Sequence, residues 1–358
     1  MKKVVYILLA VLLLVGLGLS ACAEPAPAPT PAQKILRTEV RTTSFGGSSY
    51  VLGFAGSDIL NKKSAWIRCS ALESTGSIEN IKIVGDDAKK RARSFFITTG
   101  KEFVKARAGV DQYKENPQAY QDIMMLLATT RVGYPFLTLD PNIKNIADLK
   151  GKRVAVFPKG TSKYLEAYNT LAGAGQDVVD SIKFQYTGYG GVDDMILGKT
   201  DAVPMSVIEG KKDRFHTIPV MKELMAKKPE LYIVGCTPEQ RLRSKELFGE
   251  IWGASFTILP DNFAPGIPDE PRLCSAVVLG WAIYPDVPED VVYEIVRTLY
   301  ENRNMFPEYH PGGVGLADGY FGLFPMAKKY WHPGARKYYD EMGIGYGTEY
   351  FYEEYPLK

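Results

Sequence analysis

Residues 66–84 read WIRCSALESTGSIENIKIV and have the pattern of a strand, a turn and a helix in succession. The short apolar run at 66–71 predicts a buried strand. The composition at 73–77 is typical of a turn, and residues 78–84 have the apolar spacing of a helix. Another apolar run at 93–98 predicts the next strand. Because this alternation continues along the chain, we expect an α/β fold with mostly parallel sheets flanked by helices.

Two other turns have a similar composition. Residues 44–50 (SFGGSSY) follow a strand expected at 40–44, and residues 159–162 (KGTS) follow a strand expected at 153–157. Ligands of open α/β sheets bind where strands end and helices begin, and the free N–H groups of a helix start favour an anion. Each turn alone is equally consistent with an ordinary helix cap. Together the three turns predict a site for a small anion, and none matches a phosphate-loop or dinucleotide pattern.

The amino-terminal segment predicts export and anchoring. Residues 1–22 combine two lysines, an apolar run and the tetrad Leu-Ser-Ala-Cys, which resembles the lipobox of a bacterial lipoprotein signal peptide. Cys22 is then the lipidated residue, and the Pro/Ala-rich residues 23–35 form a spacer. The protein is expected on the periplasmic or extracellular face of the cytoplasmic membrane. An uncleaved anchor helix is the alternative.

Composition gives no sign of nucleic-acid binding or catalysis. The formal net charge is +2, with 46% apolar and 23% charged residues, as in ordinary globular proteins. The three histidines form no H-E-x-x-H pattern, and no G-x-S-x-G elbow occurs. We therefore predict no catalytic residue, no metal and no cofactor. Beyond Cys22, the cysteines are Cys69, Cys236 and Cys274, an odd number that allows at most one disulfide, and buried thiols are favoured for Cys69 and Cys274.

Several segments resemble one family of transport proteins. The most specific is ESTGSIEN at 73–80, and FGGSSY at 45–50, DLKGKRVAV at 148–156 and VPEDVVYE at 287–294 add to it. These segments resemble the TAXI-type solute receptors of tripartite ATP-independent periplasmic (TRAP) transporters. The resemblance extends from about residue 38 to 340. The 148–156 motif is shared by many binding proteins and is the least specific of the four.

The resemblance implies a two-lobed periplasmic binding protein clamshell of type II. Lobe I would comprise residues 36–136 and 270–358, and lobe II residues 137–269. A small organic acid or amino-acid-like ligand would bind between the lobes, and the partners would be TRAP membrane subunits driven by an ion gradient. Three segments depart from the family pattern: residues 91–100 lack its acidic segment, 157–162 have less glycine, and 204–271 match weakly. Ligand identity therefore cannot be transferred.

The ligand-binding residues that we expect come from the three turns and from neighbouring aromatic residues. They are Ser44, Phe45, Gly46, Gly47, Ser48, Ser49, Tyr50, Thr75, Gly76, Ser77, Lys159, Gly160, Thr161, Ser162, Tyr186 and Tyr189. Lys159 is the expected cation, and Arg131 is a second candidate; an ordinary surface charge is the alternative for both. Two other functions stay open: a clamshell protein of an ATP-driven importer or sensor system, and an exported enzyme.

Overall fold

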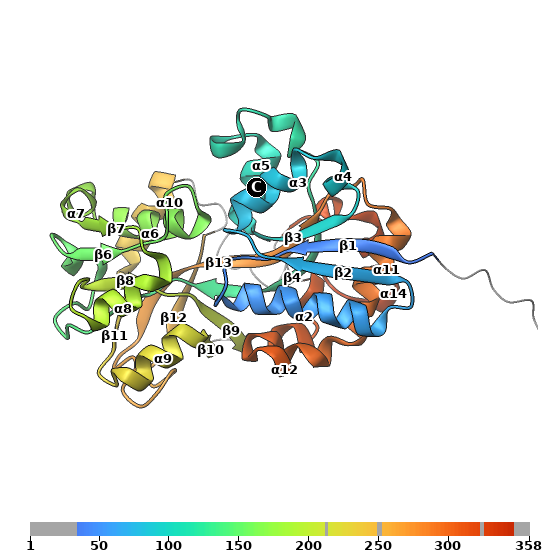
Figure 1. The fold of residues 1–358 in the computed structure, drawn as a ribbon. Coiled ribbons are helices and arrows are strands. Elements are labelled where there is room, and N and C mark those ends of the chain that lie inside the picture. The colour runs from blue at the N-terminus through green and yellow to red at the C-terminus, as the bar shows by residue number, and fades with distance from the viewer. Residues whose placement is uncertain (1–33, 212–213, 249–252, 323–325, 347–358) are drawn as a thin grey trace, which may run out of the picture. The chain divides into compact units, whose positions relative to one another are not determined.

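The computed structural model describes residues 34–211, 214–248, 253–322 and 326–346, whose strands form two sheets (Figure 1). The larger sheet has the order β10-β9-β4-β13-β3-β1-β2, and β12 also pairs with β13. Its strands are β1 (Leu36–Arg41), β2 (Ile67–Leu72), β3 (Ser94–Thr99), β4 (Met124–Gly133), β9 (Val207–Lys211), β10 (Arg214–Thr217), β12 (Gly253–Ile258) and β13 (Arg272–Ile283).

The smaller sheet has the order β11-β5-β8-β6-β7. Its strands are β5 (Phe136–Thr138), β6 (Arg153–Ala155), β7 (Lys183–Gln185), β8 (Ala202–Pro204) and β11 (Tyr232–Val234). The prediction of an α/β fold built on two sheets is confirmed.

The prediction of mostly parallel sheets is wrong. Both sheets are mixed: β1 pairs parallel with β3 and β6 with β7 and β8, whereas β4 and β13 are antiparallel to their partners. Two continuous segments account for part of this: β4 continues into β5 after two residues, and β8 continues into β9 equally closely. Because these segments run in opposite directions, β4 is antiparallel to β9 in one sheet and β5 to β8 in the other. At Tyr134–Pro135 and at Met205–Ser206 the chain passes directly from one sheet to the other.

Helices pack on both sheets (Figure 1). The α-helices are α2 (Ser48–Lys63), α3 (Ser77–Gly85), α4 (Ala88–Arg91), α5 (Gly100–Ala108), α6 (Ser162–Ala172), α7 (Gln176–Ser181), α8 (Gly191–Ile196), α9 (Pro219–Lys227), α10 (Pro238–Phe248), α11 (Glu289–Glu301), α12 (Phe306–Tyr309), α13 (Val314–Ala317) and α14 (Pro333–Met342). Helices α2, α3 and α5 contact strands of the larger sheet, and α8 contacts the smaller one.

The core of the larger sheet shows why these segments pack as they do. In α11, Val292, Ile295 and Leu299 recur at helical spacing and are fully buried. Trp281 of β13 is also fully buried, and its indole fills the space beside Gly56 of α2, where even a Cβ atom would collide with the ring. The apolar spacing of α11 and the close approach of Gly56 in α2 to Trp281 therefore hold these two helices in the core of the larger sheet.

The remaining expectations concern the amino-terminal segment and the cysteines. The signal peptide with Cys22 and nearly all of the 23–35 spacer lie outside the described residues. Within the described ranges, no helix combines the length and apolar character needed to cross a bilayer. Cys69, Cys236 and Cys274 are free and buried, as predicted for two of them.

Candidate functional site

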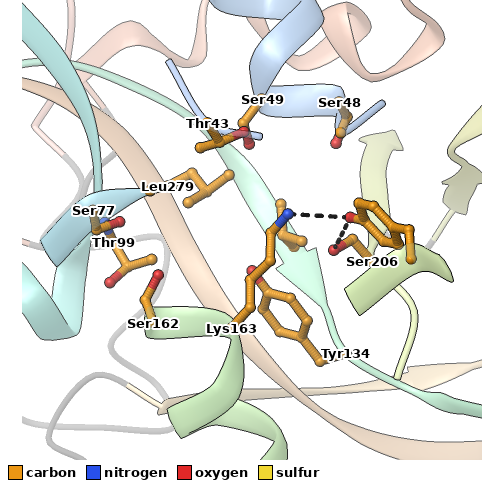
Figure 2. A pocket seen from close by; sticks show the side chains of 14 residues that line it. Thr43, Ser48, Ser49, Ser77, Thr99, Tyr134, Ser162, Lys163, Ser206 and Leu279 are labelled. Carbon is orange, nitrogen blue, oxygen red and sulfur yellow. Dashed lines mark hydrogen bonds between the residues drawn. The ribbon is translucent and has the colours of Figure 1, made fainter. Parts of the chain in front are cut away.

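Four helices begin around one hollow (Figure 2). Ser48, Ser77 and Ser162 are the first residues of α2, α3 and α6, and Thr99 immediately precedes α5. All four side chains line the hollow. Because the first N–H groups of a helix carry a partial positive charge, four helix starts at one place make it favourable for an anion.

The hollow has a volume of about 400 Å³, part of it open to solvent. Its lining consists of Thr43, Gly47, Ser48, Ser49, Gly76, Ser77, Thr99, Val132, Tyr134, Ser162, Lys163, Tyr189, Ser206 and Leu279. Residues from Thr43 to Thr99, with Val132 and Leu279, belong to the larger sheet and its loops. Ser162, Lys163 and Tyr189 follow strands of the smaller sheet, and Tyr134 and Ser206 lie on the two-residue connections β4–β5 and β8–β9 between the sheets.

Lys163 supplies a cation to the hollow. Its Nζ donates to the hydroxyl of Tyr189 at 3.3 Å and lies 4.7 Å from the ring centres of both Phe157 and Tyr189. The Tyr189 hydroxyl lies 3.1 Å from that of Ser206 (Figure 2). Among the described residues, no carboxylate forms an ion pair with Lys163. The ammonium group is thus oriented by aromatic rings and hydroxyls, and its remaining donors can meet an anion.

Thr43 carries a buried hydroxyl without a partner. Its side chain is only 7% exposed, and its Oγ1 makes no hydrogen bond among the described residues. The preceding carbonyl, of Thr42, is held in place because it accepts from Ser74 Oγ at 2.9 Å and Asn80 Nδ2 at 2.8 Å. A buried hydroxyl without a partner is destabilising, so a fixed hydroxyl that lines a hollow is suited to bind a polar guest.

Glycine allows the two sides of the hollow to approach each other. Gly76 has φ of 126°, a conformation that other residues rarely adopt, and a Cβ at this position would lie 3.4 Å from Ser162 Oγ. A Cβ on Gly47 would lie 3.8 Å from Lys163 Nζ. Loops of the larger sheet therefore face the start of α6 directly.

Seven of the sixteen predicted ligand-binding residues line the hollow. They are Gly47, Ser48, Ser49, Gly76, Ser77, Ser162 and Tyr189. The structure places nine others away from the lining, namely Ser44, Phe45, Gly46, Tyr50, Thr75, Lys159, Gly160, Thr161 and Tyr186.

The residues outside the lining have structural contacts of their own. Phe45 is 72% exposed, and its ring packs edge-on against Tyr50, with 5.4 Å between ring centres. Thr161 caps α6 by accepting from the Tyr164 N–H. Lys159 is exposed in the turn, and its Nζ lies 5.3 Å from the ring centre of Tyr186.

Sequence reasoning missed half of the lining. The missed residues are Thr43, Thr99, Val132, Tyr134, Lys163, Ser206 and Leu279. Two signals could have found some of them: Thr43 precedes the first turn, and Lys163 follows Ser162 directly. The other cation that the sequence suggested, Arg131, forms a bidentate pair with Glu209, with 2.7 Å between Nε and Oε2.

Tyr134 lines the hollow with a phenol that is neutral at ordinary pH, and burial strengthens this preference. Removal from water raises its pKa far above the ordinary value, and the nearby Glu166 carboxylate adds to the shift. Tyr134 therefore presents an O–H donor to the hollow across the ordinary pH range.

No histidine lines the hollow, and two of the three cap helix starts. The Nδ1 atoms of His310 and His332 accept from the N–H groups of Gly312 and Gly334, and burial lowers the pKa of both imidazoles to about 4. Within the described residues, no group of three or more His, Cys, Asp or Glu side chains could hold a metal ion.

Three solved structures match this chain at low sequence identity. The periplasmic binding protein BugD is 11% identical with a TM-score of 0.48, over 88% of this chain and 100% of that chain. MatC from Rhodopseudomonas palustris, with bound malate, is 11% identical with a TM-score of 0.48, over 88% and 98%. The aliphatic sulphonate binding protein SsuA from Escherichia coli is 14% identical with a TM-score of 0.41, over 88% and 89%.

A family comparison covers most of the chain. The profile of the NMT1-like family matches residues 40–343, a range that includes both sheets except the first residues of β1, and the whole lining of the hollow. The chain belongs to the NMT1-like family.

Proposed function

We propose that the protein is an extracytoplasmic solute-binding protein that captures a small organic anion in the hollow and delivers it to a membrane transporter. One observation carries the proposal: the Lys163 ammonium group and the Thr43 hydroxyl line the same hollow at which four helices begin. Cation, hydroxyls and helix starts all favour a carboxylate over a neutral or positive guest.

The magnitudes indicate which group matters most. A helix start contributes about 0.3–1 kcal/mol to anion binding, and a hydrogen bond to a charged group about 1.5–3 kcal/mol. Lys163 is therefore the largest single contributor, and the four helix starts together are comparable to it. A ligand that lacks the anionic group loses both contributions.

The proposal keeps two lobes with the hollow between them, residues 36–136 and 270–358 as lobe I and residues 137–269 as lobe II. Strands β9, β10 and β12 of the expected lobe II belong to the larger sheet, so this boundary does not coincide with the division into sheets. Lining residues come from segments of both sheets and from two short connections between them. Closure of such lobes around a solute is a hinge motion, and the short connections at Tyr134 and Ser206 are suited to it.

The transporter that we propose is of the TRAP type, driven by an ion gradient, because of the TAXI-like segments. The protein would be tethered to the membrane through Cys22. The alternative is a binding protein of an ATP-driven importer or sensor system. The membrane subunits that copurify with the full chain after crosslinking distinguish the two: an ATPase in the complex favours the alternative.

A thermal-shift screen of the purified full chain against organic acids and amino acids tests ligand capture. A ligand that binds only the folded form raises the melting temperature. We expect Lys163→Met to weaken binding of the best acid about 10- to 100-fold, equivalent to about 1.4–2.8 kcal/mol.

Lys159→Met is the matched control, because Lys159 lies three residues from Ser162 but outside the lining. It should bind as the unmodified chain does. Equal affinities in the chain and both variants would contradict the proposed role of the hollow.

A further inference from the structure

We infer that the hollow selects a short monocarboxylate that carries a hydroxyl or carbonyl oxygen, and that it discriminates against amino acids and dicarboxylates. The inference rests on the proposed function and narrows its ligand class. The observation behind it is the charge of the lining: of its fourteen residues, Lys163 is the single ionic side chain, and no Asp or Glu is present.

An ammonium group would find no carboxylate partner in the hollow. The nearby acids have other partners: Glu73 accepts from the Phe45 N–H at 2.8 Å, and Glu166 pairs with Lys101 at 3.4 Å. The ammonium group of an amino acid would also share a small space with that of Lys163. Like charges at this range repel, so the lining disfavours a zwitterion relative to the hydroxy acid of the same shape.

A second carboxylate would equally lack a cation. Arg131 is engaged with Glu209, and Lys101 with Glu166, so both of these nearby cations are already paired with acids. Neither belongs to the lining. Burial of an unpaired carboxylate is unfavourable, which excludes a dicarboxylate from tight binding.

The rest of the lining matches an uncharged polar group on a short carbon skeleton. Thr43 and Tyr134 offer hydroxyl donors, and the Thr43 hydroxyl makes no hydrogen bond within the part of the chain that the structure describes. Val132 and Leu279, from β4 and β13, add apolar contact and are 2% and 5% exposed. A hydroxyl or carbonyl oxygen next to the carboxylate would bind Thr43 and Tyr134. A small alkyl group would contact Val132 and Leu279.

Calorimetry on the purified full chain tests the inference with matched probes. Lactate is compared with alanine, 2-hydroxyisovalerate with valine, and malate represents the dicarboxylates. We expect at least one hydroxy acid to bind 30-fold or more tightly than its amino acid, and tenfold or more tightly than malate. Equal or tighter binding of alanine, valine or malate overturns the inference, as does the failure of both hydroxy acids to bind.

A variant that supplies the missing carboxylate gives a second readout. Ser49 is partly exposed in the lining, so Ser49→Asp should fold and should lower the ratio of hydroxy-acid to amino-acid affinity at least tenfold. An unchanged ratio overturns the argument from the missing acid. If alanine or valine binds preferentially and Lys163→Met abolishes that binding, the proposed function stands and only the inference fails. If no acid of the wider screen binds, both fail.

Discussion

Lys101 and Glu166 form a buried ion pair, with 3.4 Å between Nζ and Oε1 and each side chain only 5% exposed. Lys101 belongs to α5, which follows β3 of the larger sheet, and Glu166 belongs to α6, which follows β6 of the smaller sheet. The pair therefore joins two of the helices whose starts line the hollow, and Glu166 lies about one helical turn after Ser162 and Lys163 in α6.

Glu166→Ala should lower the free energy of unfolding by about 3–5 kcal/mol, because it leaves the Lys101 ammonium group buried without this carboxylate. Urea denaturation at neutral pH measures the change. The double variant Lys101→Met/Glu166→Leu removes both charges and should recover most of the loss. A double variant less stable than Glu166→Ala would contradict this account.

Ser77→Ala should weaken solute binding about fivefold to tenfold, close to the contribution of one hydrogen bond. The Ser77 oxygen already accepts from the Thr99 N–H at 3.1 Å, so its proton is available to the hollow. Thr75→Ala is the control: the sequence also suggests Thr75 as a ligand-binding residue, but it is exposed and outside the lining, so this variant should bind solute as the unmodified chain does. If calorimetry finds the same loss of solute affinity in both variants, the assignment of Ser77 but not Thr75 to the site is contradicted.

Gly76→Ala should reduce both stability and solute affinity. The left-handed φ of Gly76 disfavours a side chain, by about 1 kcal/mol or more, and the new methyl group would contact Ser162. Gly160→Ala has a similar backbone penalty at φ of 84°, but its Cβ would point into open space. It should lose stability alone. Melting temperatures and solute affinities of both variants separate backbone strain from crowding of the hollow. Equal losses of affinity in the two variants would contradict the role of Gly76 in the hollow.

Acid should destabilise the protein through its buried histidines. The pKa of His310 and His332 is about 4 in the folded chain, compared with about 6.5 when unfolded, so the unfolded state binds more protons between these values. The stabilisation is complete above pH 6.5 and is lost as the pH falls toward 4. Each histidine should account for about 2 kcal/mol between pH 7.5 and 5.

His332→Asn isolates one of these contributions. Its side-chain oxygen can still accept from the Gly334 N–H, so the start of α14 stays capped while the titrating group disappears. Urea denaturation at the two pH values should show a loss of stability about 2 kcal/mol smaller than that of the unmodified chain. An undiminished dependence would assign the effect to other groups.

Cys22→Ala tests the anchor. If Cys22 carries the lipid, the variant should leave the membrane fraction, because a soluble body without acyl chains has little affinity for a bilayer. Cell fractionation and immunoblotting give the result. Retention in the membrane fraction would point to an uncleaved anchor helix at residues 1–22.

The sequence predicted individual strands well where apolar runs are bounded by turns. Strands expected at 66–71 and 93–98 are β2 (67–72) and β3 (94–99). The strand expected at 40–44 instead runs from 36 to 41, because polar residues alternate with buried Thr38 and Val40 and hide the pattern. Sheet direction was missed, since the antiparallel pairing of β4 with β13 joins residues about 150 positions apart, and no local pattern encodes it.

The site was partly predictable for a similar reason. Gly and Ser at helix starts are local signals, so Ser48, Ser77 and Ser162 could be found. The choice between Lys159 and Lys163 depends on which one faces the rings of Phe157 and Tyr189, and that is decided by tertiary packing. Leu279 was also missed, because an apolar residue inside a strand is indistinguishable from core in a sequence.

Tyr134 and Ser206 lie on the two shortest connections by which the backbone passes from one sheet to the other, and both line the hollow. A guest in the hollow thus touches two of the segments that must bend if the sheets change their relative orientation. Occupancy and orientation are then thermodynamically coupled, and the coupling is reciprocal. A membrane partner that holds one orientation could therefore make the protein release its cargo without ever contacting that cargo.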